Sequence, residues 1–399
     1  MQKMGWLGAG AALLCALAGF EHLQDVWAAG GPAPAEGGPY RVLAPIESGN
    51  LQLFPVVRAD GKAAGETPFL TLDEGFKSGE VEVTEAGRAA GLVRPRGGPV
   101  RPYRGDEVNT LVLVNHSKRP LLLLAGEIVT GGKQDRIIAK DRIVPADADP
   151  IDLSVFCIEP GRWTGASAGF GAAANAPAKS FMVQPEVRQQ AMAAQDQQQV
   201  WNSVRGAISN MEVAAAPAAM GSGSGEPMPR TLGTTSYARA MQSTVVSEKV
   251  DEAAAPAIEG REQVLSKLRE EHAVGVVVAV RGEIIWADLF ANSDLLARYW
   301  TKLVRSYAAE SLAGGEDHAA PTVADAQHFL DAPANGTETS EGEVGIYRYR
   351  DLKSDRTETF VLESLLPGTG YDVHISKMKL RGERRTPKPF EQEQPQIYR

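Results

Sequence analysis

The sequence predicts an α+β fold with a β-rich N-terminal region, two to three helices packed on an antiparallel sheet, and a small C-terminal β appendage. Three observations predict it. Short apolar runs broken by Gly, Pro, Asn and Asp fill residues 40–158, a pattern typical of strands between turns. Apolar residues recur at helical spacing in 185–208 and 293–307. Two β-branched runs in 274–290 and three alternating runs after residue 343 add further strands.

The first 28 residues are expected to be a secretory signal peptide. Lys3 precedes an apolar run from Leu7 to Phe20, and small residues allow cleavage after Ala18 or Ala28. An uncleaved anchor is the alternative, but so short a glycine-containing run spans a bilayer poorly. No other segment is long and apolar enough for a span. We therefore expect a soluble protein exported to the periplasm or the extracellular space, with no stable membrane span after cleavage.

The composition excludes several kinds of partner and cross-link. The chain carries 41 Lys and Arg against 50 Asp and Glu, a net charge of −9, so it offers no basic surface to nucleic acid. Cys157 is the only cysteine left after cleavage, which excludes an intramolecular disulfide. Burial must stabilise the fold, and 43% hydrophobic residues are ordinary for that purpose.

Strands and one short helix are expected in the N-terminal region. The helix begins at Thr71, because Thr71 and Glu74 have capping-box spacing, and Gly79 ends it. The expected strands are Leu51–Val57, Val81–Thr84, Val108–Val114, Leu121–Leu124, Ile137–Val144 and Ile151–Ile158.

Helices are expected in the middle of the chain. Apolar residues at helical spacing predict one helix over Pro185–Ile208 and a second over Ser236–Val250. Residues 212–230 lie between them and are rich in Ala, Gly and Ser, so we expect a flexible insert there.

A β-hairpin and a helix should form a core unit after residue 273. Val274–Val280 and Glu283–Phe290 are apolar runs separated by Arg281-Gly282, a plausible hairpin turn. Ser293 is expected to cap a helix whose apolar stripe runs to Tyr307. Asp288 alternates away from the apolar face of its strand, so we expect it at the surface or in a turn.

The C-terminal part is expected to stand apart from this core. Residues 313–342 predict a linker, and 343–380 predict a small antiparallel β appendage. Residues 381–399 predict a solvated tail, since Glu383 interrupts a basic run that could otherwise bind a polyanion. The strands expected in the appendage are Gly345–Leu352, Thr357–Glu363 and Tyr371–Lys379.

The run Leu124–Arg136 is the first candidate for a site. Gly131 and Gly132 allow the backbone to turn and present N–H groups, and Lys133 adds positive charge, so the run could hold an anionic group. It resembles a phosphate loop only loosely, because an extra glycine intervenes and Gln134 replaces the metal-binding hydroxyl. The alternative is a tight turn in which Lys133 or Arg136 pairs with Glu127 or Asp135.

The run Cys157–Trp163 is the second candidate. Cys157 shares a strand face with Leu153 and Val155, which favours a core thiol over a catalytic nucleophile. Glu159 and Arg162 flank a Pro-Gly turn where side chains commonly reach solvent or a ligand. Trp163 is either a stacking platform or a lid on the core.

We expect the two turns to converge on one polar cleft. The leading hypothesis is a binding or interaction module of the bacterial cell envelope that recognises a polar or anionic ligand or an envelope protein. The alternatives are an envelope hydrolase that uses Glu127 or Glu159 as acid or base, and a purely structural domain. The six histidines have no metal-ligand spacing, so neither a metal nor a cofactor is expected. The candidate ligand-binding residues are Glu127, Lys133, Gln134, Asp135, Arg136, Glu159, Arg162 and Trp163.

Three runs in this order resemble the ARG and Rhodanese-Phosphatase-superfamily-associated protein domain family. They are Leu124–Arg136, Phe156–Trp163 and the hairpin Val276–Phe290 with the later Tyr299-Trp300 and Ser306-Tyr307. The resemblance covers about residues 40–312. The family's function is unknown, so the resemblance implies no catalytic residue. The residues that match its motifs are Gly126, Glu127, Gly132, Lys133, Gln134, Arg136, Glu159, Gly161, Arg162 and Trp163.

Overall fold

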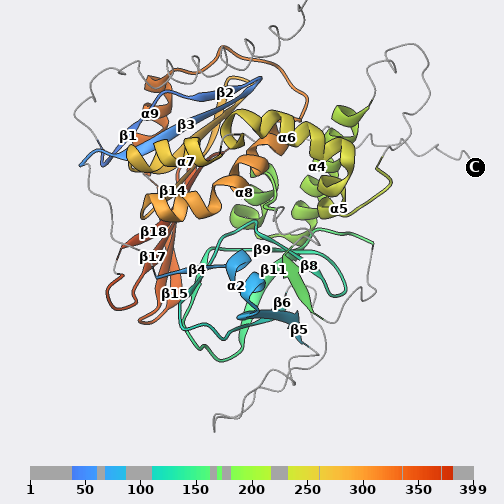
Figure 1. Ribbon diagram of the computed structural model, residues 1–399, viewed down its shortest axis with the longest axis vertical. Helices are drawn as coiled ribbons and strands as arrows, with labels where there is room; N and C mark the ends of the chain where they lie inside the picture. Colours follow the sequence, from blue (N-terminus) through green and yellow to red (C-terminus); the bar gives the residue numbers. More distant parts are fainter. Residues whose placement is uncertain are drawn as a thin grey trace, which may run out of the picture.

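The computed structural model describes residues 38–60, 68–86, 110–161, 169–172, 181–216, 232–259, 261–334, 336–369 and 371–380. The expected signal peptide, the tail after residue 380 and most of the insert at 212–230 lie outside these residues. Figure 1 shows a large sheet, a layer of helices and a second, smaller β unit.

The large sheet is antiparallel and unites the two ends of the chain. Its strands are β1 (Tyr40–Val42), β2 (Ile46–Ser48), β3 (Leu51–Arg58), β13 (Ala273–Val280), β14 (Glu283–Phe290), β15 (Thr337–Glu343), β16 (Tyr347–Lys353), β17 (Thr357–Ser364) and β18 (Asp372–Lys379). Among the described residues their order is β1-β3-β13-β14-β18-β17-β16-β15, with β2 beside β3.

The prediction that the C-terminal strands form a separate appendage is wrong. β18 pairs with β14 over five residues, so the C-terminal strands extend the main sheet. β15 lies within the expected linker and pairs with β16 along its whole length. A linker was predicted there because Thr337–Glu343 has no apolar alternation, and its residues are in fact almost all exposed.

The expected hairpin is confirmed at the centre of the sheet. Arg281 and Gly282 both have positive φ, 54° and 76°, the combination that a two-residue type I′ turn requires. All eight residues of β13 are buried, because both faces of the sheet are covered. Val276 and Val278 belong to the core on one face, and Val277 to the core on the other.

The smaller β unit is a six-stranded, nearly closed barrel. Its strands are β5 (Val81–Glu85), β6 (Thr110–Asn115), β8 (Ile128–Gly131), β9 (Arg136–Ile138), β11 (Ile151–Cys157) and β12 (Phe170–Ala172). Their order is β12-β8-β9-β11-β6-β5, and β12 returns to contact β5. A three-stranded sheet of β4 (Leu70–Thr71), β7 (Leu121–Leu123) and β10 (Arg142–Val144) adjoins it.

In this region the predicted short helix is confirmed, whereas the predicted single strand over residues 137–144 is wrong. The short helix α2 (Leu72–Ser78) is confirmed, with the Thr71–Glu74 capping box and a left-handed Gly79 at its end. The single strand expected over residues 137–144 is instead split between β9 and β10. Asp141 lies at the break and accepts a hydrogen bond from the backbone N–H of Ala125 at 2.7 Å, which fixes a bend rather than a straight strand.

The described residues contain eight α-helices, so the expected two to three were too few. Besides α2 they are α3 (Pro185–Gln189), α4 (Gln197–Ala215), α5 (Tyr237–Gln242), α6 (Thr244–Ile258), α7 (Arg261–Glu270), α8 (Ser293–Ser311) and α9 (Val323–Asp331), and a π-helical turn covers Gln190–Ala194.

Capping residues divide the helices that were expected to be continuous. Gln195 adopts a left-handed φ of 49°, and Asp196 then caps α4, which breaks the expected helix 185–208. Ser243 has an extended backbone and caps α6, which breaks the expected helix 236–250. The N-cap of α8 is Asn292 rather than Ser293.

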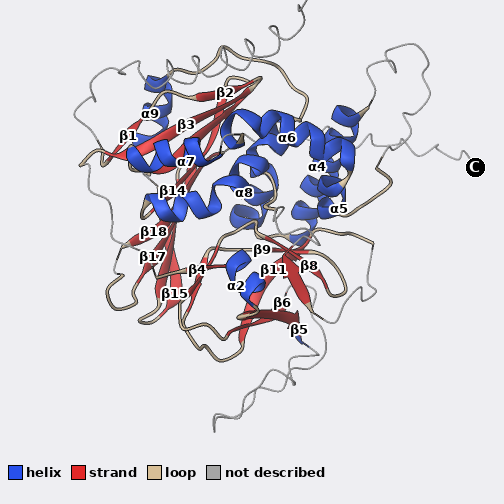
Figure 2. Ribbon diagram, in the orientation of Figure 1, coloured by secondary structure: helices blue, strands red, loops and turns tan. Residues whose placement is uncertain are grey.

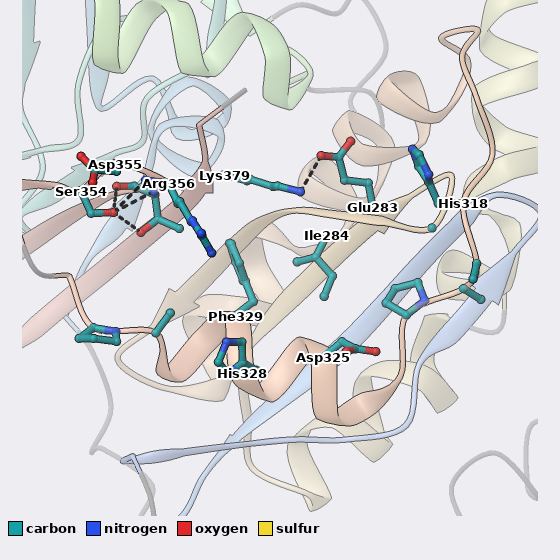
Figure 3. Close-up of a pocket in the computed structure, with 17 residues that line it drawn as sticks. Glu283, Ile284, His318, Asp325, His328, Phe329, Ser354, Asp355, Arg356 and Lys379 are labelled. Atoms are coloured by element: carbon teal, nitrogen blue, oxygen red, sulfur yellow. Dashed lines mark hydrogen bonds and ion pairs between the residues drawn. The ribbon is translucent and has the colours of Figure 1, made fainter. Parts of the chain in front are cut away.

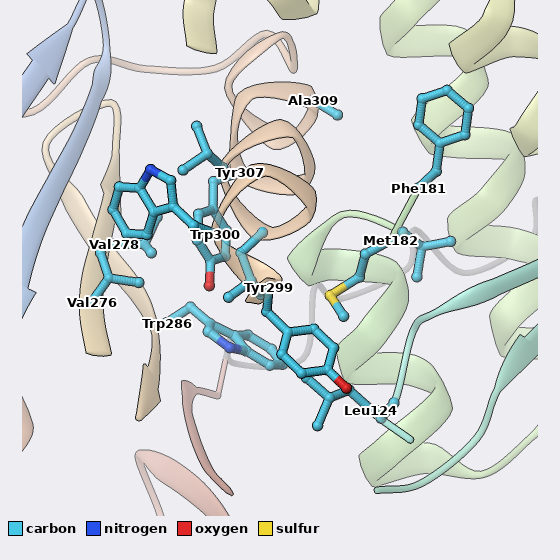
Figure 4. Packing of buried hydrophobic residues seen from close by; sticks show 14 of the residues in the cluster. Leu124, Phe181, Met182, Val276, Val278, Trp286, Tyr299, Trp300, Tyr307 and Ala309 are labelled. Atoms are coloured by element: carbon cyan, nitrogen blue, oxygen red, sulfur yellow. The ribbon is translucent and has the colours of Figure 1, made fainter. Parts of the chain in front are cut away.

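Helices cover both faces of the large sheet. α6, α7 and α8 lie on one face, with α4 and α5 between them and the barrel, and α9 lies on the other face (Figures 1 and 2). The first face holds the aromatic core, where Trp300 and Tyr307 of α8 pack near Trp286 of β14 (Figure 4). No helix in the described ranges is long and apolar enough to cross a membrane.

Candidate functional site

The two predicted turns meet in the barrel. β9 pairs with β11 so that Arg136 lies opposite Cys157, which places the residues before β9 beside those after β11. The side-chain amide of Gln134 donates to the backbone oxygen of Glu159 at 3.1 Å, and the backbone N–H of Asp135 donates to the Glu159 carboxylate at 3.2 Å. The ends of the two runs therefore lie side by side at Gln134, Asp135 and Glu159, which is one part of the expected convergence.

Their meeting point is an internal polar junction rather than an open cleft. Gln134, Asp135, Arg136 and Glu159 are at most 6% exposed. The Asp135 carboxylate accepts from the backbone N–H of Gly131 and from the Ser236 hydroxyl, at 3.2 and 2.9 Å. These carboxylates and amides bond to the protein itself.

Lys133 is half-buried, and its backbone N–H donates to the Glu85 carboxylate at 2.8 Å. Arg162 and Trp163 lie outside the described residues.

Glycine is required at two points of the first turn. Gly126 and Gly132 have φ of 88° and 51°, which disfavours any side chain. A Cβ on Gly126 would lie 2.5 Å from Cγ of Arg188, and one on Gly132 would lie 2.2 Å from Cζ of Phe170. The glycines therefore admit close neighbours, which a structural corner needs as much as a binding loop does.

Glu127 belongs to a different polar cluster, between the barrel and α8. Its fully buried carboxylate accepts from Lys302 Nζ at 2.6 Å and from the backbone N–H of Leu124 at 2.7 Å. Lys302 also pairs with Asp73 of α2 at 2.7 Å. Burial raises the pKa of Glu127, and the adjacent Lys302 opposes that shift. The carboxylate that a hydrolase would use is thus occupied by a buried ion pair.

The thiol of Cys157 lies in the core, as expected. The residue is fully buried, and its Sγ accepts a long contact of 3.5 Å from the backbone N–H of Glu159. Burial raises the pKa of the thiol, which keeps it protonated and disfavours a nucleophilic role.

Asp288 was expected at the surface, and this prediction is wrong. It is fully buried in β14 and makes two bonds to the guanidinium of Arg188, at 2.8 and 3.1 Å. Ser376 donates to it at 2.7 Å, and Tyr307 donates to it as well. Burial alone would raise its pKa, but Arg188, aided by His374, holds the pKa of Asp288 well below its usual range.

His374 links this aspartate to the barrel. Its Nδ1 lies 2.6 Å from Asp141 and its Nε2 lies 3.2 Å from Asp288. Burial would lower the pKa of His374, but Asp141 outweighs it and the pKa rises to about 9. Two cations and two anions thus balance in a wholly internal network. Among the described residues, no cluster of three or more His, Cys, Asp or Glu side chains is arranged to hold a metal ion.

An open cavity of about 920 Å³ lies elsewhere, between α9 and the ends of strands β14, β17 and β18. We call it the α9 groove. Ile284 and Phe329 form an apolar floor, and Lys379, Arg356 and Glu283 lie around it (Figure 3).

The charged side chains around the α9 groove differ in whether they have a bonding partner. Lys379 pairs with Glu283 at 2.8 Å. The Asp325 carboxylate is occupied at the start of α9, where it accepts from the backbone and hydroxyl of Thr322. Arg356 is exposed, and no carboxylate within the described ranges pairs with it. Figure 3 shows its side chain directed toward Phe329, with Asp355 pointing the other way.

Comparison with protein families adds one finding. The family model described as ARG and Rhodanese-Phosphatase-superfamily-associated Protein domain matches residues 39–378. The chain belongs to this family. No curated protein and no solved structure was found to match it.

The ARG and Rhodanese-Phosphatase-superfamily-associated region extends further than the resemblance in the sequence indicated. That resemblance ended near residue 312, whereas the match runs to 378 and takes in α9 and most of β18. The sheet gives the physical reason, because β14 and β18 are adjacent strands of one layer.

Sequence reasoning missed both the buried network and the α9 groove. Asp288 is 100 residues from Arg188, and His374 is 233 residues from Asp141, so nothing local in the sequence marks these pairs. A signal for α9 was present, since Thr322 and Asp325 form a capping box directly after Pro321. Ala326 and Phe329 follow at helical spacing. Together with the capping box, they could have predicted the helix α9 within the expected linker.

Proposed function

We propose that the protein is a binding module of the cell envelope and that it holds an anionic ligand in the α9 groove. The observation that carries this proposal is Arg356, a cation with no carboxylate partner in the described part of the chain, directed over an apolar floor. Concave sites that combine apolar walls with a few polar groups are the usual form of ligand sites. A carboxylate or phosphate oxygen would complete the Arg356 guanidinium.

The two glycine turns are assigned a structural role in this proposal. Their polar groups bond to one another and to Ser236, and they are almost wholly buried. A ligand would have to displace those bonds to reach them, at a cost of about 1–3 kcal/mol for each buried group left unpaired. A ligand can enter the α9 groove without breaking such internal bonds.

The envelope location rests on the sequence alone. The charged start, the apolar run and the small residues of the first 28 residues support export.

Ligand binding to the full chain tests the proposal. We expect a thermal-shift screen of amino-acid carboxylates, anionic sugars and nucleotides to yield at least one stabilising anion. Titration calorimetry with that anion should show that Arg356→Gln weakens binding tenfold or more, since a charged hydrogen bond contributes about 1.5–3 kcal/mol.

A matched control removes the same charge elsewhere. Arg205 is exposed on α4, which lies on the opposite side of the sheet from α9, so Arg205→Gln should leave the affinity unchanged. A flat response across the screen, or equal affinities for both variants, would contradict the proposal.

A further inference from the structure

A second cavity adjoins the α9 groove. It measures about 410 Å³ and is lined by Asn50, in the turn between β2 and β3, and by Gln52 of β3. Gly282, His318 and Ala320 line both cavities, so the two are separated by a single shared wall. The first cavity alone reaches the upper end of the range of about 300–1,000 Å³ that small-molecule sites occupy. The pair therefore offers room for a ligand longer than a single metabolite.

The shared wall is held firmly in place. A Cβ on Gly282 would lie 2.5 Å from the backbone oxygen of His318, so the loop before α9 lies directly on the hairpin turn. Arg281 fastens that loop, with Nε donating to the oxygen of Ala313 at 2.7 Å and Nη1 to Asp317 at 2.8 Å. The backbone N–H of His318 donates to the oxygen of Arg281 at 2.9 Å. The two cavities are thus fixed relative to each other.

We propose that the two cavities are subsites for one extended peptide that carries a carboxylate. This inference rests on the proposed function and adds the class of ligand. Arg356 takes the carboxylate, and Ile284 and Phe329 receive an apolar side chain. Asn50 lies at the other end. Its Nδ2 donates to the backbone oxygen of Ser311 at 3.1 Å, so its Oδ1 is the atom that can accept from a peptide N–H.

The charge pattern favours a peptide over other polymers. A polyanion would be repelled, because acidic side chains outnumber basic ones along the two cavities. The acids are Glu47, Glu283, Asp317, Asp325 and Asp355, and the cations are Arg281, Arg356 and Lys379. A neutral oligosaccharide would leave Arg356 without an anion. A peptide combines a single carboxylate, apolar side chains and regularly spaced amides, so it satisfies all three kinds of surface in the two cavities.

Peptides of graded length test the inference on the full chain. A random hexapeptide pool with free carboxyl termini is selected for binding, and the best sequence is then shortened to four and two residues at the end away from its carboxylate. We expect affinity to rise at least tenfold from two to six residues. Amidation of the carboxylate should weaken all three lengths.

Paired variants separate the two subsites. Asn50→Ala should weaken the hexapeptide about fivefold and leave the dipeptide unchanged, whereas Arg356→Gln should weaken both. Asn202→Ala removes the same side-chain type from α4 and should change neither. Thermal unfolding of each variant checks that the fold is retained.

Each contrary result has a distinct meaning. If Arg356→Gln weakens binding but peptide length and Asn50 do not matter, the anion site stands and the extended ligand is wrong. If Arg356→Gln has no effect, both proposals fail. If no peptide is selected but a neutral oligosaccharide binds and Asn50→Ala weakens it, the peptide assignment is overturned.

Discussion

The glycine turns of the barrel and the α9 groove carry the same kinds of side chain in different settings. In the turns Gln134, Asp135 and Glu159 are nearly inaccessible and bond to one another. In the groove Arg356 is exposed to solvent, without a carboxylate partner in the described part of the chain. The turns drew attention in the sequence because their charges are dense and flanked by glycine, whereas the groove is assembled from separate segments with no motif.

The difference teaches that a dense polar motif marks a constrained place, not necessarily an accessible one. Buried polar groups require partners, and such partners must be specified by residue type. A ligand site requires instead that some polar group be left available. If this distinction is right, interior substitutions should change stability without changing affinity, and groove substitutions should do the reverse.

The largest effect on stability is expected from Asp288→Ala. The substitution leaves Arg188 and His374 buried without their shared anion, and breaking a buried ion pair costs about 3–5 kcal/mol. Urea denaturation at pH 7 measures the loss.

The matched control for Asp288 is Glu252→Ala. The Glu252 side chain is 73% exposed and pairs with Lys249 on the surface, so the variant should lose less than about 1 kcal/mol. Equal losses in the two variants would show that the internal network contributes no more than a surface pair.

The network should also make the free energy of unfolding fall as the pH rises above neutral. The folded pKa of His374 is about 9, above its ordinary 6.5, so its contribution is fully present below pH 6.5 and is lost as pH rises through 9. The loss is about 3 kcal/mol, because each tenfold gain in proton affinity on folding corresponds to about 1.4 kcal/mol. Denaturation midpoints from pH 6 to pH 10 measure it.

The control for the pH effect is His374→Gln, which should flatten this slope. Lys377 acts in the opposite sense. Burial lowers its pKa from 10.5 to about 8, so its contribution to the free energy of unfolding rises as pH increases from 8 to 10.5. Lys377 is present in both proteins, so the difference between their curves isolates His374. Parallel curves would contradict the assignment.

A smaller loss is expected from Gly132→Ala in the first turn. The left-handed backbone costs about 1 kcal/mol for alanine, and displacement of Phe170 adds to that. Gly345→Ala is the control, because Gly345 has φ of 74° with nothing within 4 Å of its added Cβ. Chemical denaturation should give a larger loss at Gly132, and similar losses would mean that Phe170 moves freely.

The smallest effect on stability is expected from Arg356→Gln. The side chain is exposed and pairs with no carboxylate in the described ranges, so unfolding free energy should change by less than about 0.5 kcal/mol. The same variant should lose ligand affinity, as proposed above. A large loss of stability would place Arg356 with the interior residues and remove the contrast between the two regions.

Local signals in the sequence predicted those features whose causes are local. The Arg281-Gly282 turn and the Thr71–Glu74 capping box were both found, because turn and capping geometry depend on a few adjacent residues. The contact between the ends of the two glycine runs was also expected, but an open cleft was predicted there and the structure has a buried junction. Whether solvent reaches their meeting point depends on the packing of Ser236 and its neighbours, which are about 100 residues away in the sequence.

Features that depend on distant partners were not predictable. Asp288 alternates as a surface residue would, and only Arg188 and His374 from other elements make its burial possible. β15 carries no apolar pattern and becomes a strand through its pairing with β16. The split of the expected helix 185–208 follows from a single left-handed residue, Gln195, which helical periodicity does not reveal.

Among the described residues β15 is the last strand of the large sheet, and its composition has a consequence for association between molecules. An open strand edge offers unpaired backbone groups to any other extended chain. β15 carries Glu338, Glu341 and Glu343, and the last two form ion pairs with Lys140 and Arg142 of the adjoining barrel region. A second copy that docked edge to edge would bring further carboxylates against this border and would have to accommodate the two cations beside it. Charge on this border therefore opposes edge-to-edge pairing of β15 with a strand of a second copy.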